Sequence, residues 1–305
     1  MIDLTTRPPF PTTWDNTMRA QLVTCPRSAF YRFFHHIDFA TPSVHLHAGA
    51  AYAKGMEVTR KLFYSGQADA RTAIAEGLRA LWLAYGDFEC PETEAKTALR
   101  MAGAFEFYFA NWPLESDYVK PHMVSGQPTV EFNFVLPIPE VAHPETGEPI
   151  LYCGRFDMLG NYNGTLFIED DKTTKQLGPT WPNKWRLRSQ FTGYCWGARQ
   201  YGFPVAGAII RGVSILKTKY DKAEAIVYRP QHMVDAWYDQ LVRDLHRAID
   251  MWRAGHFDAS FADACDSYGG CNFSKVCESN NPQSWLNGPD FTQRIWDPAH
   301  NGDNF

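Results

Sequence analysis

Residues 151–174, LYCGRFDMLGNYNGTLFIEDDKTT, hold the pattern on which the interpretation of the fold depends. Apolar and aromatic residues dominate Leu151 to Leu159 and Leu166 to Asp170, and the turn sequence NYNG lies between these two runs. Two such runs on either side of an Asn-Gly turn are typical of adjacent strands. The sequence therefore predicts a hairpin that carries GRFD on one strand and IEDDKTT at the end of the other.

Such a hairpin brings two carboxylates and a lysine to one place. Asp157 and Asp170 offer oxygen ligands for a hard divalent cation, and Lys172 offers a positive charge beside a scissile phosphate. Because side chains alternate along a strand, Asp170 and Lys172 are expected on one face. Asp171 then points away, and only its backbone carbonyl can reach a metal. An isolated D-x-K is most often a charged turn, so the neighbouring motifs must decide between a turn and a metal site.

Outward from the hairpin, the pattern changes from helices to strands and back. Apolar residues at helical spacing predict four helices before the first strand, in Asn16–His36 with a break near Cys25-Pro26, Val44–Tyr64, Ala68–Tyr85 and Glu92–Asn111. The other predicted elements are strands Thr129–Leu136, Val205–Leu216 and Ala223–Tyr228 and helices Arg188–Tyr201 and Gln231–Ala254. The central order is β-β-β-α-β-β, followed by a cysteine-rich region and a tail that we expect to be irregular.

Composition and charge indicate an ordinary globular protein with one basic segment. The 305 residues are 45% hydrophobic and 21% charged, and the absence of a leader or a long apolar run predicts a cytoplasmic protein without a membrane span. The net charge is -5, but residues 171–222 carry +8, interleaved with aromatic residues. Such a segment is either a solvated face or a nucleic-acid-binding surface, for which the candidates are Lys175, Lys184, Arg186 and Arg188.

Three motifs occur together in this region. The D-x-K of Asp170 to Lys172 ends an apolar strand, the G-x-x-D of Asp157 precedes it by 13 residues, and a Q-x-x-x-Y, Gln190 to Tyr194, follows on a helix. Together they resemble the RecB-like branch of the PD-(D/E)XK nucleases, which includes AddB-type, CRISPR-adaptation and phage exonucleases. The resemblance implies an α/β fold, with a restriction-endonuclease-like core in which helices flank a central mixed sheet.

The same resemblance implies roles for these residues. Asp157 and Asp170 would bind Mg²⁺ or Mn²⁺, Lys172 would be the catalytic lysine, and Gln190 and Tyr194 would position the substrate. The family usually has a His four residues after a Gly on an upstream helix. This sequence departs from that pattern, because Ala53 follows Gly49. Glu57, one turn later, is then the expected upstream metal ligand. The alternative is an ordinary surface Glu that pairs with Arg60 or Lys61.

Four of the seven cysteines suggest a metal centre: Cys25 near the start and Cys265, Cys271 and Cys277 near the end. Thiolates suit iron-sulfur clusters or zinc. Relatives of the RecB-like type often hold a 4Fe-4S cluster with one N-terminal and three C-terminal cysteines, although their first C-terminal pair is often closer than this C-x5-C. Zinc and unrelated thiols stay open as alternatives. Cys90, Cys153 and Cys195 are expected to be buried and inert.

These expectations combine into one integrated domain and one leading function. The regions are 1–125, helical and contributing Cys25 and Glu57, then 126–255, the nuclease core, and 256–305, the cysteine-rich region and tail. The leading hypothesis is a Mg²⁺- or Mn²⁺-dependent DNA exonuclease of phage or bacterial recombination, repair or processing. No G-x-x-x-x-G-K-[ST] occurs, so unwinding would need a partner helicase. The alternatives are a non-catalytic nucleic-acid-binding or assembly protein on the same fold, and a zinc-stabilised helical interaction module.

Overall fold

The computed structural model describes residues 3–4, 6–261, 263–266 and 270–299. The chain forms two compact units, each built from segments that are distant in the sequence. The first unit consists of Met1–Pro42, Val135–Gly154 and Asp235–Asn301, and the second includes Ser43–Phe134 and Arg155–Val234. The predicted N-terminal helical region thus contributes to both units. None of the helices in the described ranges is long and apolar enough to cross a membrane.

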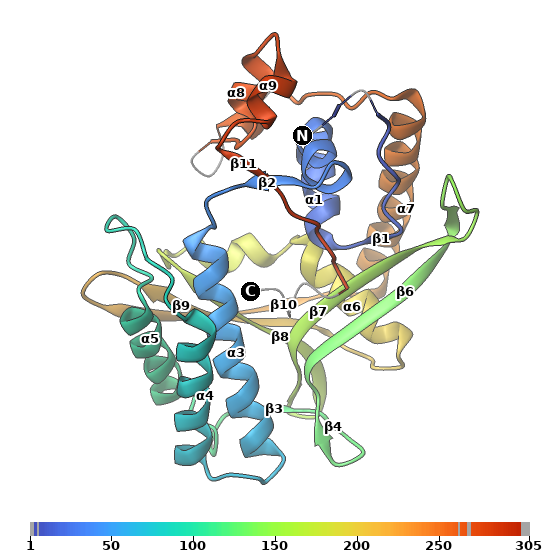
Figure 1. The fold of residues 1–305 in the computed structure, drawn as a ribbon. Helices are drawn as coiled ribbons and strands as arrows, with labels where there is room; N and C mark the ends of the chain where they lie inside the picture. The colour runs from blue at the N-terminus through green and yellow to red at the C-terminus, as the bar shows by residue number, and fades with distance from the viewer. Residues whose placement is uncertain (1–2, 5, 262, 267–269, 300–305) are drawn as a thin grey trace. The chain divides into compact units, whose positions relative to one another are not determined.

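A mixed sheet forms the centre of the second unit (Figure 1). Its strands are β3 (Val119–Pro121), the start of β6 (Val130–Ala142), the end of β7 (Pro149–Tyr162), β8 (Thr165–Thr174), β9 (Gly207–Ile215) and β10 (Tyr220–Tyr228). The order is β7-β8-β9-β10, and β3 and β6 also pair with β7. The β7–β8 and β9–β10 pairs are antiparallel, whereas β8–β9 is parallel. A parallel pair needs a long crossover, and the chain between β8 and β9 provides it.

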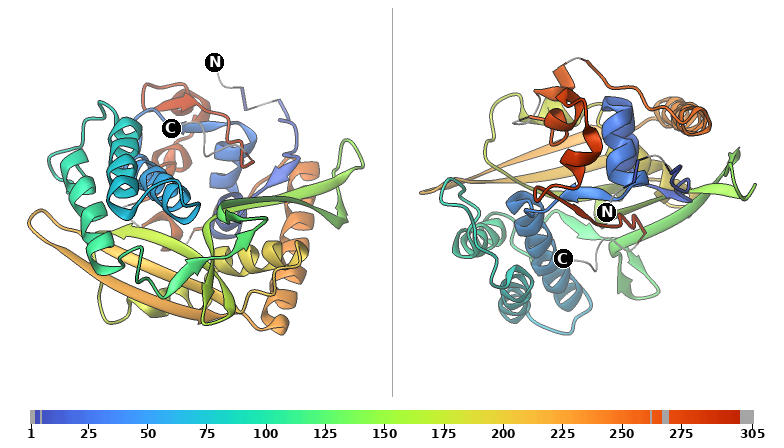
Figure 2. Two further views of the ribbon diagram at one scale, coloured as in Figure 1. Left: turned by 90° about the horizontal axis from the view of Figure 1, so that it is seen from below. Right: turned by 45° about the horizontal axis from the view of Figure 1, so that its top comes forward.

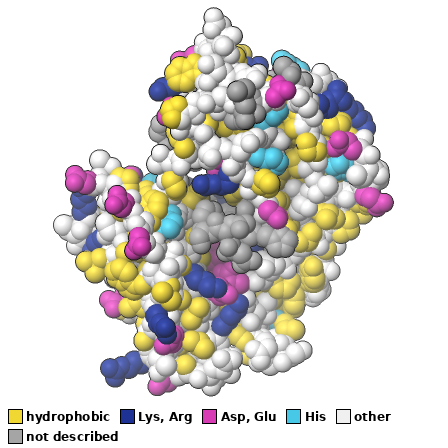
Figure 3. Space-filling view, viewed as in Figure 1, with side chains coloured by type: hydrophobic (Ala, Val, Ile, Leu, Met, Phe, Trp, Pro, Cys, Tyr) yellow, Lys and Arg dark blue, Asp and Glu magenta, His cyan; other side chains and the backbone are white. Residues whose placement is uncertain are grey.

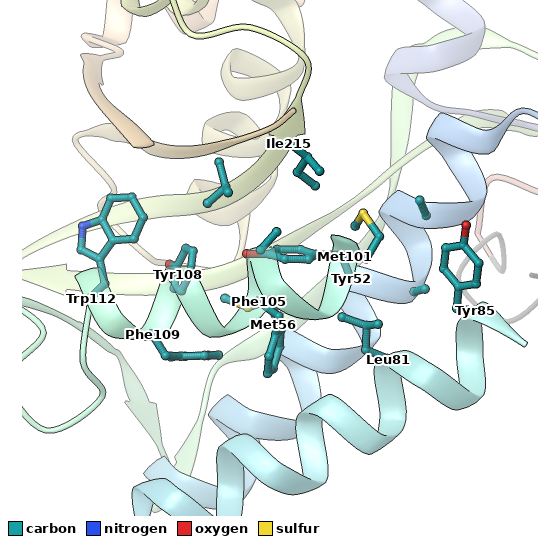
Figure 4. Close-up of a cluster of buried hydrophobic side chains, with 14 of the residues drawn as sticks. Tyr52, Met56, Leu81, Tyr85, Met101, Phe105, Tyr108, Phe109, Trp112 and Ile215 are labelled. Carbon is teal, nitrogen blue, oxygen red and sulfur yellow. The ribbon is translucent and has the colours of Figure 1, made fainter. Parts of the chain in front are cut away.

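Three helices pack together on one side of this sheet: α3 (Val44–Tyr64), α4 (Ala70–Tyr85) and α5 (Ala98–Asn111). Figure 4 shows their apolar residues meeting between the helices and β9, with Tyr52 and Met56 from α3, Leu81 from α4, Phe105 from α5 and Ile215 from β9. The left view of Figure 2 shows the same three helices on one side of β8, β9 and β10. This cluster fixes α3 against β9, the parallel neighbour of β8 in the sheet.

The opposite face of the sheet is covered by the crossover between β8 and β9. This crossover contains the 3-10 helix η2 (Trp181–Trp185) and the helix α6 (Ser189–Gln200). On β9, Val213 belongs to the cluster with α3–α5, whereas a side chain added at Gly212 would meet Trp181 of η2. Neighbouring residues of one strand therefore face different helical layers, as alternation requires. The predicted α/β architecture, a mixed sheet flanked by helices, is confirmed.

The first unit combines N-terminal and C-terminal segments of the chain (Figures 1 and 2). Its N-terminal elements are β1 (Thr13–Trp14), α1 (Asn16–Thr24), α2 (Pro26–Ala29), the π-helix η1 (Phe30–Phe34) and β2 (Ile37–Phe39). Its C-terminal elements are most of α7 (Gln231–Ala254), η3 (Asp263–Cys265), α8 (Ser274–Glu278), α9 (Pro282–Leu286) and β11 (Phe291–Gln293). β2 pairs with β11, and Tyr31, Phe273 and Val276 share one apolar cluster.

The structure agrees with most of the predicted long helices, but it differs from the prediction at one helix start and in the C-terminal tail. Val44–Tyr64 and Gln231–Ala254 are helical from end to end, but the helix predicted from Glu92 begins at Ala98. The tail was predicted to be irregular, which is wrong for its described part, because it contains α9 and β11. These short elements have weak local signals, and they are held by packing against residues near the N-terminus. The small two-stranded sheet of β4 (Met123–Val124) and β5 (Gln127–Pro128) was not predicted either.

Candidate active site

The β7–β8 hairpin brings Asp157 and Asp170 together. The antiparallel register of the two strands reaches Met158 and Glu169, so Asp157 and Asp170 are the next residues on their strands. At this point the Asp157 side chain continues the pairing. Its Oδ2 accepts a hydrogen bond of 2.7 Å from the backbone N–H of Asp171. The hairpin geometry predicted from the sequence is therefore present, with the carboxylates at the ends of the paired segment.

The charges at this point are unbalanced. Burial raises the pKa of Asp157 well above its usual value, and the neighbouring Asp170 carboxylate raises it further. Burial raises the pKa of Asp170 as well, although the Lys172 ammonium contacts its Oδ2 and opposes this shift. Burial lowers the pKa of Lys172, but Asp170 and Asp157 raise it by more. A divalent cation would relieve the repulsion between the two carboxylates, as metal ions do in other carboxylate sites.

The donor atoms fit a small hard cation. Mg²⁺ is usually bound through one or two carboxylates together with water and substrate phosphate oxygens, and Mn²⁺ prefers similar ligands. Within the described ranges no three His, Cys, Asp or Glu side chains are arranged to hold a metal ion. The predicted ligands at this point are therefore two carboxylates, Asp157 and Asp170, and the backbone carbonyl of Asp171. Oxygen donors of this kind match Mg²⁺ or Mn²⁺ and not a soft metal.

The side chain of Asp171 points away from this pair, as the alternation along β8 predicts. Its Oδ2 lies 2.8 Å from Nη1 of Arg60, a residue of α3. The same guanidinium lies 2.6 Å from Glu169 Oε1 through Nη2. Glu169 and Asp171 therefore face α3, while Asp170 and Lys172 face the other side of the strand. The four consecutive charged residues Glu169 to Lys172 divide between two faces of one strand.

The helix α6 presents Gln190 and Tyr194 near the motif strands. Gln190 Nε2 donates a hydrogen bond of 2.9 Å to the Tyr194 hydroxyl, so the two predicted positioning groups lie on one face of the helix. The Tyr194 ring lies 5.8 Å from the ring of Phe156, which precedes Asp157 on β7. Lys172 Nζ lies 6.0 Å from the ring of Phe191. These contacts place α6 beside the face of β8 that carries Asp170 and Lys172.

Glu57 lies on α3 and is bound by two lysines. Lys54 Nζ lies 3.0 Å from its Oε2, and Lys61 Nζ lies 2.6 Å from its Oε1. Burial raises the pKa of Glu57, but the bonds from Lys61 and Lys54 lower it by more, so the carboxylate is held ionised. Figure 3 shows basic and acidic side chains next to one another over the C-terminal part of α3. Of the two partners that the surface alternative named, Lys61 is present and Arg60 is not.

Glu131, on β6, is a further acidic residue that the sequence interpretation missed. Its backbone has φ 57°, a left-handed conformation that is rare in non-glycine residues and concentrates at functional sites. Burial raises the pKa of Glu131 to about 7. Arg155, whose Nε lies 3.1 Å from Glu131 Oε2, lowers this pKa, but by less than burial raises it. Glu57 raises the pKa of Glu131, and Glu131 raises that of Asp157. The sequence VEFNF reads as an ordinary strand, so only the structure shows that this carboxylate is near the pair.

The sequence matches the profile of the PD-(D/E)XK nuclease superfamily over residues 19–278. The chain belongs to this superfamily. A structural comparison also pairs it with the crystal structure of SSO0001, at 14% sequence identity and a TM-score of 0.28, over 66% of this chain and 74% of that chain. No curated protein matches the chain. The superfamily consists in general of nucleases that use Mg²⁺ or Mn²⁺, which agrees with the oxygen donors at the hairpin.

The basic residues of this PD-(D/E)XK chain are only partly available to a nucleic acid. Lys184, Arg186 and Arg188 are exposed, at the end of η2 and before α6. Lys175 is exposed but lies 2.7 Å from Glu94 Oε1. Arg211 belongs to the same basic segment but is 1% exposed and buried in ion pairs. The exposed charge of this segment is therefore smaller than its sequence suggests.

The four cysteines of the predicted cluster all lie in the first unit of the chain. Cys25 separates α1 from α2, Cys265 ends η3, and Cys277 lies in α8. Burial raises the pKa of Cys265, and so do the nearby thiols of Cys271 and Cys25. Burial raises the pKa of Cys277, and Cys25 and Cys271 add to this shift, whereas Arg27 lowers it. Each C-terminal cysteine thus lies within electrostatic range of Cys25 or of another member.

These cysteines meet part of the requirement for a metal centre. All seven cysteines of the chain are free thiols, and Cys271 N donates a hydrogen bond of 2.7 Å to Cys265 O. In the described part of the chain, no three of these thiols are arranged to hold a metal ion. Of the three cysteines predicted to be buried, Cys153 and Cys195 are, but Cys90 is not. Cys90 lies in the irregular segment before α5, where little chain covers it.

Proposed function

We propose that this PD-(D/E)XK chain is a metal-dependent deoxyribonuclease, an exonuclease that hydrolyses phosphodiester bonds in DNA recombination, repair or processing. The observation that carries the proposal is the meeting of Asp157, Asp170 and Lys172 at the ends of the paired part of the β7–β8 hairpin. Two acidic oxygen donors and an ammonium at one point are the groups that phosphodiester hydrolysis requires. Membership of the nuclease superfamily supports the same conclusion.

Each residue of the site has a distinct task in this proposal. Asp157 and Asp170 would hold Mg²⁺ or Mn²⁺, which polarises the phosphate and lowers the pKa of a water when bound. Lys172 stabilises the negative charge that develops on the phosphate. Gln190 and Tyr194, joined by their hydrogen bond, orient the substrate from α6. The exposed Lys184, Arg186 and Arg188 contact backbone phosphates of the DNA.

The test is a nuclease assay on end-labelled single- and double-stranded DNA, and on RNA, with Mg²⁺, Mn²⁺ or EDTA. Asp157→Ala, Asp170→Ala and Lys172→Ala should each abolish metal-dependent cleavage while circular dichroism stays unchanged. Because members of one catalytic unit are not additive, a double variant should be scarcely worse than a single one. Asp87→Ala and Lys120→Ala, at exposed positions, are the controls. Near wild-type cleavage by pure Lys172→Ala would contradict the mechanism.

A second candidate is a non-catalytic nucleic-acid-binding protein on the same fold. Ala53 stands where the RecB-like pattern has a His. Lys54 and Lys61 both bind the Glu57 carboxylate, so a metal would have to compete with them for the one acidic side chain of this helix face. The same assay separates the two candidates, because both bind DNA but only the enzyme gives product when metal is added. DNA binding without product in Mg²⁺ or Mn²⁺ would favour this second candidate.

We further propose that Cys25, Cys265, Cys271 and Cys277 hold a 4Fe-4S cluster. Cys25 and Cys271 raise the pKa of both Cys265 and Cys277, which supports the proposal, because it requires thiols of distant segments to lie within electrostatic range of one another. Ligation by four cysteines leaves no open position for substrate, so the cluster would be structural. Zinc is the alternative, and iron and zinc analysis of protein purified without oxygen distinguishes them. Four thiols that react freely with an alkylating agent in native, metal-loaded protein would contradict both.

A further inference from the structure

Arg60 is a buried cation on the side of β8 opposite to the candidate metal ligands. It is 3% exposed, and its two terminal nitrogens bind different carboxylates, Glu169 at 2.6 Å and Asp171 at 2.8 Å. These two residues flank Asp170 in the sequence and point to the α3 side of the strand. Arg60 therefore holds β8 immediately before and immediately after the residue proposed to bind metal.

Further hydrogen bonds and ion pairs surround Arg60 and Glu169. Its Nη2 also donates to the Tyr108 hydroxyl at 2.8 Å, and that hydroxyl donates to Glu169 Oε1 at 3.2 Å. Arg211, which pairs with Asp171 in the β8–β9 register, lies 3.4 Å from Glu169 and binds Asp117 through two nitrogens at 2.6 and 2.7 Å. The network thus joins α3, α5, β8 and β9.

A buried ionic network of this kind is not by itself evidence of a gain in stability. Moving two ions from water into the interior is costly, and a buried ion pair is often no more stabilising than apolar residues of the same volume. What such a pair supplies is geometry, because a guanidinium presents a planar fork with fixed directions. Here Nη2 of Arg60 donates a hydrogen bond to Glu169, and Nη1 forms an ion pair with Asp171 that lacks hydrogen-bond geometry. One guanidinium therefore holds two alternate side chains of the strand from the α3 side.

We propose that Arg60 is a positioning residue of the active site, which sets the place of the Asp170 carboxylate and the Asp171 carbonyl by anchoring Glu169 and Asp171. This inference rests on the proposed metal-dependent function. Partners one step removed from a metal typically change its affinity 10- to 100-fold when they are mutated. Loss of the Arg60 fork is therefore expected to weaken Mn²⁺ binding by about tenfold or more.

The experiment begins with the site itself, so that two failures stay distinguishable. Mn²⁺ affinity is measured by the electron paramagnetic resonance signal of free Mn²⁺, first in wild type and in Asp170→Ala. If wild type binds no Mn²⁺, or Asp170→Ala binds it equally well, the proposed function fails, and the inference on Arg60 with it. If Asp170 proves essential, the Arg60 variants test the inference separately.

Arg60→Lys is the first variant, because it keeps the charge and removes the fork. Its Mn²⁺ dissociation constant should rise about tenfold or more, and cleavage should recover at high Mn²⁺ with kcat changed less than the metal dependence. Arg79→Lys, on the exposed side of α4 beside Glu76, is the matched control and should behave as wild type. A folded Arg60→Lys protein with wild-type Mn²⁺ affinity would overturn the inference.

A second variant covers the case in which Arg60→Lys does not fold. Arg60→Met combined with Asp171→Asn removes one positive and one negative charge, so the net charge is unchanged, and Glu169 keeps its contact with Arg211. The double variant should be nearly as thermally stable as wild type, while its Mn²⁺ affinity should stay below that of wild type. Recovery of both stability and Mn²⁺ affinity would mean that Arg60 has a purely structural role, and would overturn the inference.

Discussion

At the scale of single residues, Glu57 is the member of the candidate site whose role the sequence left most open. Two lysines, Lys54 and Lys61, bind its carboxylate, and a metal would have to compete with them. If Glu57 contributes to the metal site, Glu57→Gln should raise the Mn²⁺ dissociation constant about tenfold, because it removes the charge and keeps the bulk. Glu76→Gln on α4 is the control. Identical titration midpoints for Glu57→Gln and wild type would show that Glu57 is a surface residue.

Lys96 is a second residue with a measurable signature, this time in stability. Lys96 is 3% exposed, and its ammonium donates to Thr173 Oγ1 at 2.8 Å and to Thr173 O at 3.3 Å. Burial lowers the pKa of Lys96 to about 8. An unfolded lysine has a pKa of about 10.4. Between these two values the unfolded state binds more protons than the folded state, so stability rises with pH.

The measurement is the free energy of unfolding in urea at several pH values, compared with Lys96→Met. Between pH 7.5 and 10.5, the free energy of unfolding of wild type should rise by about 3 kcal/mol relative to that of Lys96→Met. Tyrosine and cysteine titrations affect both proteins, so they cancel in the difference. Lys184→Met, at an exposed position, should give a curve parallel to wild type. A parallel curve for Lys96→Met as well would contradict the prediction.

At the scale of elements, the contact between α3 and α4 depends on two glycines that face each other. A Cβ at Gly77 would overlap Thr59 Oγ1 and lie 2.7 Å from the carbonyl oxygen of Gly55, which cannot move without distorting α3. Gly77→Ala should therefore destabilise the protein by about 1–3 kcal/mol, as overpacking in well-packed cores does. Because α3 carries Arg60 and Glu57, Mn²⁺ affinity should fall as well.

Gly49, also on α3, is the matched control, since nothing lies within 4 Å of the position that its Cβ would take. Gly49→Ala should stabilise by about 0.5–1 kcal/mol, because alanine loses less backbone entropy in a helix. Thermal unfolding followed by circular dichroism compares both variants with wild type. Equal melting temperatures for Gly77→Ala and Gly49→Ala would show that the helices adjust to the added methyl group.

At the scale of the whole molecule, the proposed cysteine centre would join distant parts of the first unit. Cys25 and Cys265 are 240 residues apart in the sequence. Loop-closure entropy grows slowly with length, by about 0.6 kcal/mol for each doubling, so a clasp of this length is feasible. Protein purified without oxygen should be brown, and Cys25→Ala should lose both this colour and much of its thermal stability.

Cys90→Ala is the control for this prediction, because Cys90 is a partly exposed thiol in the second unit. It should keep the visible absorption and the iron content of wild type. Loss of colour in Cys25→Ala without any loss of stability would mean that the centre does not brace the fold. Colourless wild-type protein that contains zinc would favour the zinc alternative and keep the clasp.

Local patterns in the sequence were enough to predict the hairpin and the faces on which its charged side chains lie. The alternation of side chains along Glu169 to Lys172 placed Asp170 and Lys172 on one face and Asp171 on the other, because a strand has a period of two whatever surrounds it. The helical spacing of apolar residues likewise predicted Val44–Tyr64 and Gln231–Ala254 from end to end. These features depend on neighbours in the chain, so a single sequence suffices to predict them.

Tertiary structure decided which residues the hairpin meets. Arg60 was expected, if anything, beside Glu57 on the surface of α3, but it is buried against Glu169 and Asp171. Glu131 lies near Asp157 although its strand has no distinguishing pattern. Such partners are set by how far each strand slides in register and where each helix packs on the sheet. Those positions depend on the shape of the entire core, and no local period in the sequence encodes them.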